Sequence, residues 1–157
     1  MVSRQCLCTR MDGCMKKWDM RYLDLAKFIS TWSKDPSTKC GAVIIDEDNR
    51  IVSTGFNGFP KGIHDDDRLK SRNTKYEMIL HAENNAILFA KQDLHHCTLY
   101  TWPYQPCSQC ASMVIQSGIK RVVSPQISTK RWETSFGLAN DMLKEANIET
   151  LYIGQKP

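Results

Sequence analysis

Strands and helices alternate along the second half of this chain, and this order constrains its fold more than any other feature. Apolar, β-branched runs predict strands, and apolar residues at helical spacing between them predict helices. The predicted elements are, in order, a strand at 97–102, a helix at 107–116 closed by Gly118, a strand at 120–124, a helix at 135–146 and a strand at 149–153. Strands joined through helices favour parallel pairing in one sheet, so the order indicates an α/β fold.

The first half adds a helix and a hairpin to this sheet. Apolar residues recur at helical spacing over 19–34, and two apolar runs at 40–45 and 51–56 flank a polar turn. The glycine- and proline-rich segment 55–67 reads as a loop, and 82–91 as a further helix. An antiparallel hairpin beside parallel strands makes the sheet mixed, so we expect a three-layer α/β/α sandwich around five strands.

Length and composition fit one domain. The chain has 157 residues, of which 41% are hydrophobic and 24% charged, as in soluble globular proteins. We expect an N-terminal extension at 1–18 and a single domain at 19–157. The apolar runs are too short to cross a membrane, and the first residues lack the hydrophobic region of a secretory signal. Seven cysteines, two of them spaced Cys-x-x-Cys, fit a reducing compartment, so we expect a cytoplasmic protein.

Basic residues crowd the stretch before His81. The net charge is only +4, yet five basic side chains fall within fifteen residues, namely Lys61, Arg68, Lys70, Arg72 and Lys75. Three aspartates at 65–67 offset much of this charge. The stretch is therefore either a docking place for nucleotide phosphates or a solvated loop.

Two short stretches carry the chemistry of a metal site. His81 stands at the head of one predicted helix, and Cys107 and Cys110 lie three apart at the head of another, after Pro106. Cysteines at this spacing share a helix face, and the helix N-terminus favours the thiolate form that metals bind. One imidazole and two thiolates suit a zinc ion and leave a fourth tetrahedral position for water, as in catalytic sites.

Glu83 completes the site as a proton carrier. It lies two residues from the histidine ligand, where it can take a proton from the water and deliver it to a substrate. The alternative is a structural zinc site, which would need a fourth protein ligand. The candidates are His95, His96 and Cys97, none of which is paired in spacing with Cys107.

The order His-x-Glu followed by Pro-Cys-x-x-Cys is the signature of zinc deaminases. From about residue 19 to 153 the chain resembles the deoxycytidylate (dCMP) deaminases. The resemblance rests on the stretches 33–36 (Ser-Lys-Asp-Pro), 40–44 (Cys-Gly-Ala-Val-Ile), 55–60 (Gly-Phe-Asn-Gly-Phe-Pro), 75–76 (Lys-Tyr), 81–87 (His-Ala-Glu-Asn-Asn-Ala-Ile) and 116–120 (Gln-Ser-Gly-Ile-Lys). It implies a cytidine deaminase-like fold and a hydrolase that acts on a C–N bond, converting dCMP to dUMP and ammonia for thymidylate synthesis.

The resemblance also implies roles for the loop after the hairpin. Asn57 would lie beside the substrate and orient the nucleotide; the alternative is a turn asparagine in the left-handed conformation. Gly58, Pro60, Lys61 and Gly62 would help form an effector site between subunits of a hexamer. The family implies activation by dCTP and inhibition by dTTP, with Mg²⁺ accompanying the triphosphate.

Other expected substrate contacts come from the starts of the two helices and from the segment that joins the strand at 97–102 to the second of them. The backbone at Ala82 and Cys107 would help hold the ring and the tetrahedral intermediate. The link 101–106 is one residue longer than is common in the family, and either Trp102 or Tyr104 would stack on the pyrimidine or pack in the core. The sequence also leaves a second zinc site possible, for which the candidate ligands are His64, Cys6, Cys8 and Cys14.

Two other functions stay open. A deaminase acting on tRNA or on a single strand would need a basic, aromatic track, which three aspartates dilute here; we expect no stable nucleic-acid partner. A non-catalytic zinc module for protein contacts would have a closed coordination sphere. Whether CMP or dCTP is also a substrate is undecided by the sequence.

Overall fold

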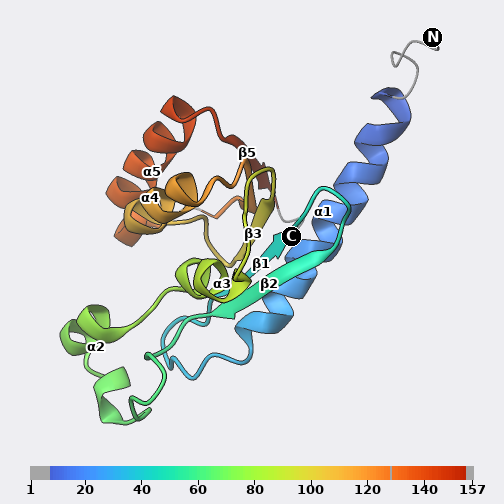
Figure 1. Ribbon diagram of the computed structural model, residues 1–157. Coiled ribbons are helices and arrows are strands. Elements are labelled where there is room, and N and C mark those ends of the chain that lie inside the picture. Colours follow the sequence, from blue (N-terminus) through green and yellow to red (C-terminus); the bar gives the residue numbers. More distant parts are fainter. Residues whose placement is uncertain (1–7, 128, 155–157) are drawn as a thin grey trace.

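The computed structural model describes residues 8–127 and 129–154, and their side chains from residue 16 onward. Five strands form one mixed sheet in the order β2-β1-β3-β4-β5 (Figure 1). β1 pairs antiparallel with β2 and with β3, whereas β4 pairs parallel with β3 and with β5. The strands are β1 (Gly41–Ile45), β2 (Ile51–Phe56), β3 (Thr98–Trp102), β4 (Arg121–Pro125) and β5 (Glu149–Ile153). The predicted hairpin and mixed sheet are confirmed.

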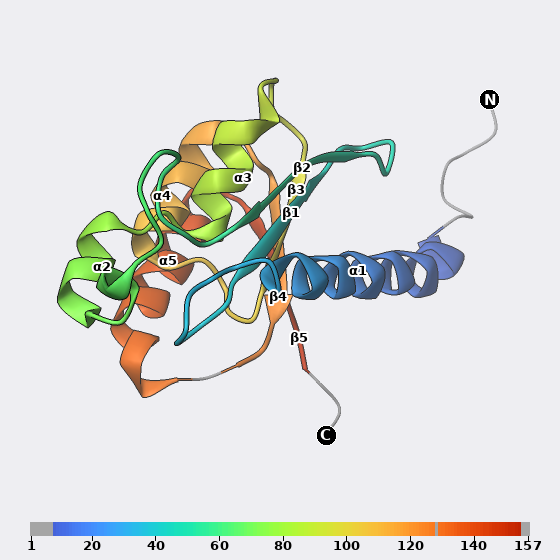
Figure 2. The ribbon, with the colours of Figure 1, turned by 90° about the horizontal axis from the view of Figure 1, so that it is seen from below.

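Helices cover both faces of this sheet. Helix α1 lies on one face and α3, α4 and α5 lie on the other, as Figure 2 shows most clearly. Helix α2 stands apart from the sheet, beyond the end of β2 (Figure 1). The helices are α1 (Cys8–Ser30), α2 (Arg72–Met78), α3 (Ala82–Ala90), α4 (Ser108–Ser117) and α5 (Glu133–Glu145), with short 3₁₀ turns at Asp67–Leu69 and Lys130–Trp132. This is the expected three-layer α/β/α sandwich.

Alternation along the central strands builds two separate cores. Ala42 and Ile44 of β1 point into the core beneath α3, α4 and α5, while Val43 and Ile45 point into the core beneath α1. Successive strand residues face opposite sides of a sheet, so a continuous apolar run indicates a strand buried on both faces. All five residues of β1 are buried, as that rule requires.

Helix α1 begins earlier than its apolar spacing predicts. We expect residues 19–34 from sequence, but the helix starts at Cys8 and ends at Ser30, so the expected boundary between residues 18 and 19 falls inside it. Its first turns extend beyond the sheet (Figure 1), where no apolar face is needed. Its second half is fixed by Asp19, which accepts bidentate hydrogen bonds of 2.8 and 2.9 Å from Arg121 and one of 2.7 Å from Tyr100.

Two glycines allow helices to approach the sheet closely. A Cβ at Gly41 would lie 2.1 Å from the carbonyl oxygen of Ala26 in α1, and one at Gly55 would lie 2.3 Å from that of Ala82 in α3. Both neighbours are backbone atoms, which cannot rotate away. Gly55 therefore sets the distance between β2 and the first turn of α3.

Replacing Gly55 with alanine should destabilise the protein by about 3 kcal/mol or more, because the added methyl group must push α3 off the sheet. Urea unfolding followed by circular dichroism measures this change. Gly137→Ala is the matched control: Gly137 lies in α5 with open space around its Cα, so alanine should stabilise by up to about 1 kcal/mol. Equal stability of the Gly55→Ala variant and the parent would contradict the close-approach argument.

No helix within residues 8–127 and 129–154 combines the length and the apolar character needed to cross a bilayer.

Candidate metal centre and its pocket

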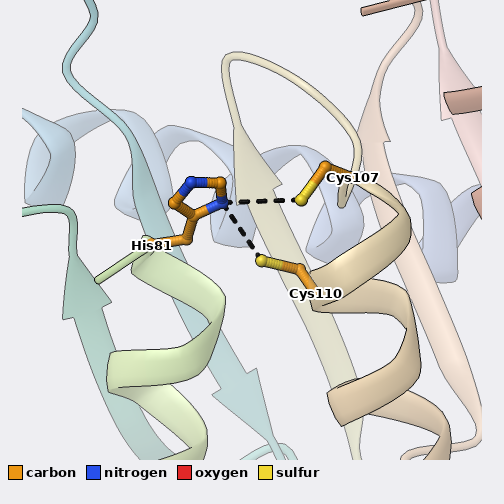
Figure 3. A group of neighbouring side chains, drawn as sticks. All are labelled: His81, Cys107 and Cys110. Carbon is orange, nitrogen blue, oxygen red and sulfur yellow. Dashed lines mark hydrogen bonds between the residues drawn. The ribbon is translucent and has the colours of Figure 1, made fainter. Parts of the chain in front are cut away.

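His81, Cys107 and Cys110 converge at one point above the sheet. His81 immediately precedes α3, and the cysteines lie at the start of α4, so two helix N-termini face the same spot (Figure 3). His81 Nδ1 lies 3.5 Å from Cys107 Sγ and 3.2 Å from Cys110 Sγ. All three ligand atoms lie within 4.8 Å of one another. The two stretches identified from sequence are thus brought together as predicted.

The spacing of these atoms fits zinc. Two ligands of a tetrahedral zinc ion, one nitrogen and one sulfur, lie about 3.6 Å apart at usual bond lengths. The two nitrogen–sulfur distances here, 3.5 and 3.2 Å, are close to that value. Thiolate and imidazole are also the donor types that zinc prefers. The residues present therefore fit a zinc ion without rearrangement of the backbone.

The positions of His81 and Cys107 show that the local sequence favours ligation over helix capping. Each is the N-cap residue of its helix, a position usually taken by serine, threonine, aspartate or asparagine, and neither side chain makes a capping hydrogen bond. Both side chains are turned toward the shared point instead (Figure 3). Gly118, with φ of 88°, ends α4 as predicted.

The three-ligand cluster has no fourth member among the described residues. His95, His96 and Cys97 lie outside the cluster. Cys97 is buried in the core beneath α3, α4 and α5, and the exposed His95 ring contacts Asp93. A structural zinc site would need a fourth protein ligand, so the arrangement favours an open coordination position.

The thiol of Cys107 is prepared for metal binding. Hydrogen bonds that the Cys107 sulfur accepts from Cys110 and from His81 lower the pKa of this thiol to about 4. The contact with Cys107 and burial raise the pKa of the Cys110 thiol. At neutral pH Cys107 is therefore a thiolate, the form that binds a metal ion.

Glu83 lies in the first turn of α3 and faces the same pocket. Its side chain is buried, with 7% of the residue exposed, and burial raises the pKa of its carboxyl group. A raised pKa makes a carboxylate a better proton acceptor, and a buried carboxyl group beside a metal site is a candidate for general acid–base catalysis. This is the environment that a proton carrier needs.

A cavity opens beside the metal cluster and is walled by four segments. One wall comes from the loop before β1 and from Asn57 after β2, a second from α2, a third from the link between β3 and α4, and a fourth from the turn that precedes α5. The lining residues are Asp35, Ser37, Thr38, Cys40, Gly41, Asn57, Lys75, Tyr76, Ile79, His81, Glu83, Trp102, Tyr104, Gln105, Cys107, Arg131, Trp132 and Phe136. Two of the three predicted metal ligands, His81 and Cys107, and the proton carrier Glu83 thus border a pocket.

Aromatic rings form the fourth wall. Trp132 stacks on Phe136 with centroids 6.2 Å apart and meets the His81 ring edge-on at 6.5 Å. It also contacts Tyr76 of α2, at 6.4 Å. A hydrogen bond from the Ser108 backbone N–H to Ser135 Oγ, 3.0 Å long, ties this segment to the start of α4. The apolar side of the pocket is therefore held beside the metal cluster.

Asn57 lies in the pocket wall with its amide already engaged. Its Nδ2 donates to the Thr38 carbonyl oxygen at 2.9 Å and to Asp35 Oδ2 at 3.4 Å, and its Oδ1 accepts from the Cys40 backbone N–H at 2.8 Å. Asn57 is not among the described residues with positive φ, so the alternative of a left-handed turn asparagine is wrong. Only the second lone pair of Oδ1 is left for a ligand.

Of the other expected substrate contacts, two line the cavity and one does not. Tyr104 and Trp102 line the cavity, and the Tyr104 ring packs against Phe136 at 6.1 Å. Ala82 does not line it: its side chain is buried in the core beneath α3, α4 and α5, so any contact with a ligand would use its backbone.

The loop residues with expected effector roles lie outside this cavity. Gly58 pairs with Leu80 in an isolated bridge, Lys61 sits 4.8 Å from the centroid of the Phe89 ring, and Gly62 has φ of 84°. Pro60 accepts a backbone hydrogen bond from Ile63 in the same turn.

Aspartates of the same stretch pair with two of its five basic residues, Arg68 and Lys70. Arg68 pairs with Asp66, Lys70 with Asp67, and Lys34 with Asp65, all at 2.8–2.9 Å. Of the five basic residues noted in the sequence, only Lys75 lines the cavity. Arg68 and Lys70 thus fit the interpretation as a solvated loop, whereas Lys75 belongs to the cavity wall.

Most candidate ligands for a second zinc ion lie outside the described part of the chain. Cys6 and the side chains of Cys8 and Cys14 are not described. His64 is exposed and belongs to no metal-binding cluster among the described residues.

Sequence reasoning missed the fourth wall, including Arg131, Trp132 and Phe136. A usable signal exists: this segment follows the carboxyl end of the parallel strand β4, and ligands in α/β folds bind at the carboxyl ends of such strands. It also missed α2, because a helix with a single buried residue has no apolar periodicity.

Comparison with known proteins agrees with this geometry. Residues 16–125 match the family model described as the cytidine and deoxycytidylate deaminase zinc-binding region. An uncharacterised deaminase of Aliivibrio fischeri is 42% identical over 142 residues, covering 88% of this chain and 95% of that protein. A probable deoxycytidylate deaminase of Caenorhabditis elegans is also 42% identical, covering 87% and 70%. The human deoxycytidylate deaminase is 37% identical, covering 74% and 68%.

A solved structure shares the fold. The dCMP deaminase of the cyanophage S-TIM5, in complex with dCMP and dUMP, superposes with a TM-score of 0.71 at 23% identity, covering 87% of this chain and 97% of that one. The expected cytidine deaminase-like architecture is thereby confirmed.

Proposed function

Since the chain belongs to the cytidine and deoxycytidylate deaminase family, we propose that it hydrolyses dCMP to dUMP and ammonia and so supplies dUMP for thymidylate synthesis. The observation that carries the proposal is the three-membered cluster His81, Cys107 and Cys110 beside the buried Glu83; of these residues His81, Cys107 and Glu83 line one pocket. The names of the relatives support dCMP as the substrate. The pocket offers apolar walls for a pyrimidine and polar groups at one side.

His81, Cys107 and Cys110 would hold the zinc ion. When bound there, zinc would bring the pKa of a water molecule near neutrality and so supply hydroxide at physiological pH. Glu83 takes the proton released as water adds to C4 of the pyrimidine, passes it to the ring nitrogen N3, and carries a proton to the departing amino group. Tyr104 and Trp132 border the ring, and Asn57 Oδ1 accepts a hydrogen bond from the sugar.

Arg131 is the residue that we assign to the 5′-phosphate. Its guanidinium carbon lies 5.2 Å from the Tyr76 ring centroid and 5.4 Å from that of Trp132, at the cavity wall. It forms no ion pair with any residue in the described ranges 8–127 and 129–154. The other lining cation, Lys75, is already paired with Asp35. A guanidinium resting on aromatic faces keeps its N–H edge free for a phosphate.

Replacing Arg131 with glutamine should lower kcat/KM for dCMP about 10- to 100-fold, because a charge-assisted hydrogen bond to phosphate is lost. Steady-state ammonia release measures it. Arg72→Gln is the matched control: Arg72 also lies over the Tyr76 ring, at 5.6 Å, but does not line the cavity. Equal losses in the two variants would refute the assignment of Arg131.

We propose further, from the family, that dCTP activates and dTTP inhibits the enzyme. Gly58, Pro60, Lys61 and Gly62 would serve an effector site between subunits of a homohexamer, with Mg²⁺ accompanying the triphosphate. Their position outside the catalytic cavity is compatible with a separate site. Sedimentation and steady-state rates with and without each triphosphate and Mg²⁺ test the assembly and its regulation; rates that neither effector changes would rule out regulation.

One experiment tests the proposed reaction. Deamination of dCMP, CMP, dCTP, deoxycytidine and a single-stranded oligonucleotide is measured side by side at equal enzyme concentration. We expect the highest kcat/KM for dCMP. A higher value for the oligonucleotide would establish the rival nucleic-acid deaminase, and turnover of none of them by zinc-loaded protein would establish the rival non-catalytic zinc module.

A further inference from the structure

Helix α2 docks on the pocket through a single buried side chain, and that side chain is a lysine. Of the seven residues Arg72–Met78, only Lys75 is buried, with 4% exposed. Its Nζ lies 3.0 Å from Asp35 Oδ1 and 3.1 Å from Ser37 Oγ. Helices usually dock by burying an apolar stripe. The ion pair, rather than an apolar contact, is therefore what joins α2 to the opposite pocket wall.

Asp35 is itself held firmly by the loop that precedes β1. Its Oδ1 accepts backbone N–H hydrogen bonds from Ser37 at 2.7 Å and Thr38 at 3.3 Å, and its own backbone N–H donates to Ser33 Oγ at 3.2 Å. The side chains of Asp35 and Lys75 are each 5% exposed. A buried pair of this kind is not screened by solvent, and removal of one partner leaves an uncompensated charge.

Docking of Lys75 places the next residue at the pocket mouth. The Tyr76 ring lies between α2 and the segment before α5, 5.2 Å from the Arg131 guanidinium carbon and 6.4 Å from the Trp132 ring. Tyr76 is 38% exposed, so burial holds it much less firmly than it holds Lys75, which is 4% exposed. Its position, and with it the aromatic face under Arg131, depends on the anchor one residue earlier.

We infer that Lys75 and Asp35 are positioning residues that hold Tyr76 against Arg131 and thereby set the affinity of the pocket for a nucleotide phosphate. This inference rests on the proposed function, since it concerns the phosphate of the substrate. Neither residue is a phosphate ligand, because each charge is satisfied by the other. Their effect passes through Tyr76 to Arg131.

A double-mutant cycle of Lys75→Met and Arg131→Gln, measured on zinc-loaded protein with dCMP, tests this coupling. Lys75→Met alone should raise KM about tenfold or more and change kcat much less, since the metal cluster and Glu83 are untouched. In the Arg131→Gln background the same substitution should change KM by less than about twofold, because the group it positions is gone. Lys70→Met, which breaks an exposed pair in the same segment, is the control and should leave KM unchanged.

The result that overturns the inference is a KM effect of equal size in both backgrounds, an effect confined to kcat, or no effect. If Lys75→Met alone does not fold, the double variant Asp35→Asn/Lys75→Met replaces it in the cycle, because it leaves no unpaired buried charge. Failure of the proposed function is seen separately, as absence of dCMP turnover by the unmodified protein. Coupling that is absent in an active enzyme counts against the inference alone.

Discussion

Replacement of Glu83 by glutamine is expected to lower kcat for dCMP about 10³- to 10⁴-fold while the zinc content stays at that of the parent protein. The amide keeps the size of the carboxyl group but cannot accept and return a proton, and positioned general acid–base groups contribute factors of this size. Glu83 is not a member of the cluster that would hold the metal, so zinc binding should survive. Ammonia release and metal analysis of the same sample measure the two quantities.

Glu133 offers a matched control for this substitution. Like Glu83 it lies in the first turn of a helix, but it is exposed and does not line the cavity. Glu133→Gln should leave kcat within about twofold of the parent, as surface substitutions away from a site do. Normal ammonia release by Glu83→Gln would contradict the role of Glu83 as proton carrier. Loss of zinc together with activity would show that the residue supports metal binding instead.

The metal site could be predicted from sequence because its geometry is local. Cys107 and Cys110 share a helix face at a fixed spacing, and the distance from His81 to Glu83 is set by the first turn of α3. Only the meeting of the two helix heads is a tertiary fact, and the ligand types together with the zinc deaminase signature predicted it. The sheet could be predicted from the order in which strands and helices alternate along the chain. Its buried strands are recognisable as continuous apolar runs, and β5 has the predicted bounds.

The remaining pocket walls could be predicted only in part. Asn57, Trp102 and Tyr104 are expected near the substrate, and the position after β4 could have pointed to the fourth wall, but the other lining residues are distant in sequence and carry no repeating pattern. The pair Asp35 and Lys75 spans forty positions, and its members look like ordinary surface charges until their burial is known. Arg131 and Trp132 lie in a short 3₁₀ turn without a buried residue. Asn57 illustrates the same limit, because its Nδ2 donates to Asp35 and Thr38, in an irregular loop that no sequence pattern places beside it.

Replacement of Cys110 by serine is expected to abolish both zinc binding and deamination. A serine hydroxyl is not ionised at neutral pH and its oxygen is a poorer ligand for zinc than a thiolate, so two ligands remain where three are needed. Metal analysis after dialysis should fall from about one zinc per chain to near zero. Thermal unfolding should also shift downward, since a bound ion that links the first turns of α3 and α4 stabilises the folded state.

Cys97→Ser separates loss of the metal from the general cost of a buried hydroxyl. Cys97 is 3% exposed in the core beneath α3, α4 and α5 and lies outside the metal cluster. Its replacement should cost about 1–3 kcal/mol of stability and leave zinc content and kcat near those of the parent, because an unpaired polar group is buried but no ligand is lost. If Cys110→Ser kept its zinc while Cys97→Ser lost it, the ligand set would have to include Cys97 in place of Cys110; loss of zinc in both variants would indicate a four-ligand, structural site. The opposite result, with zinc lost only when Cys110 is changed, is the one that the nitrogen–sulfur distances at His81 require.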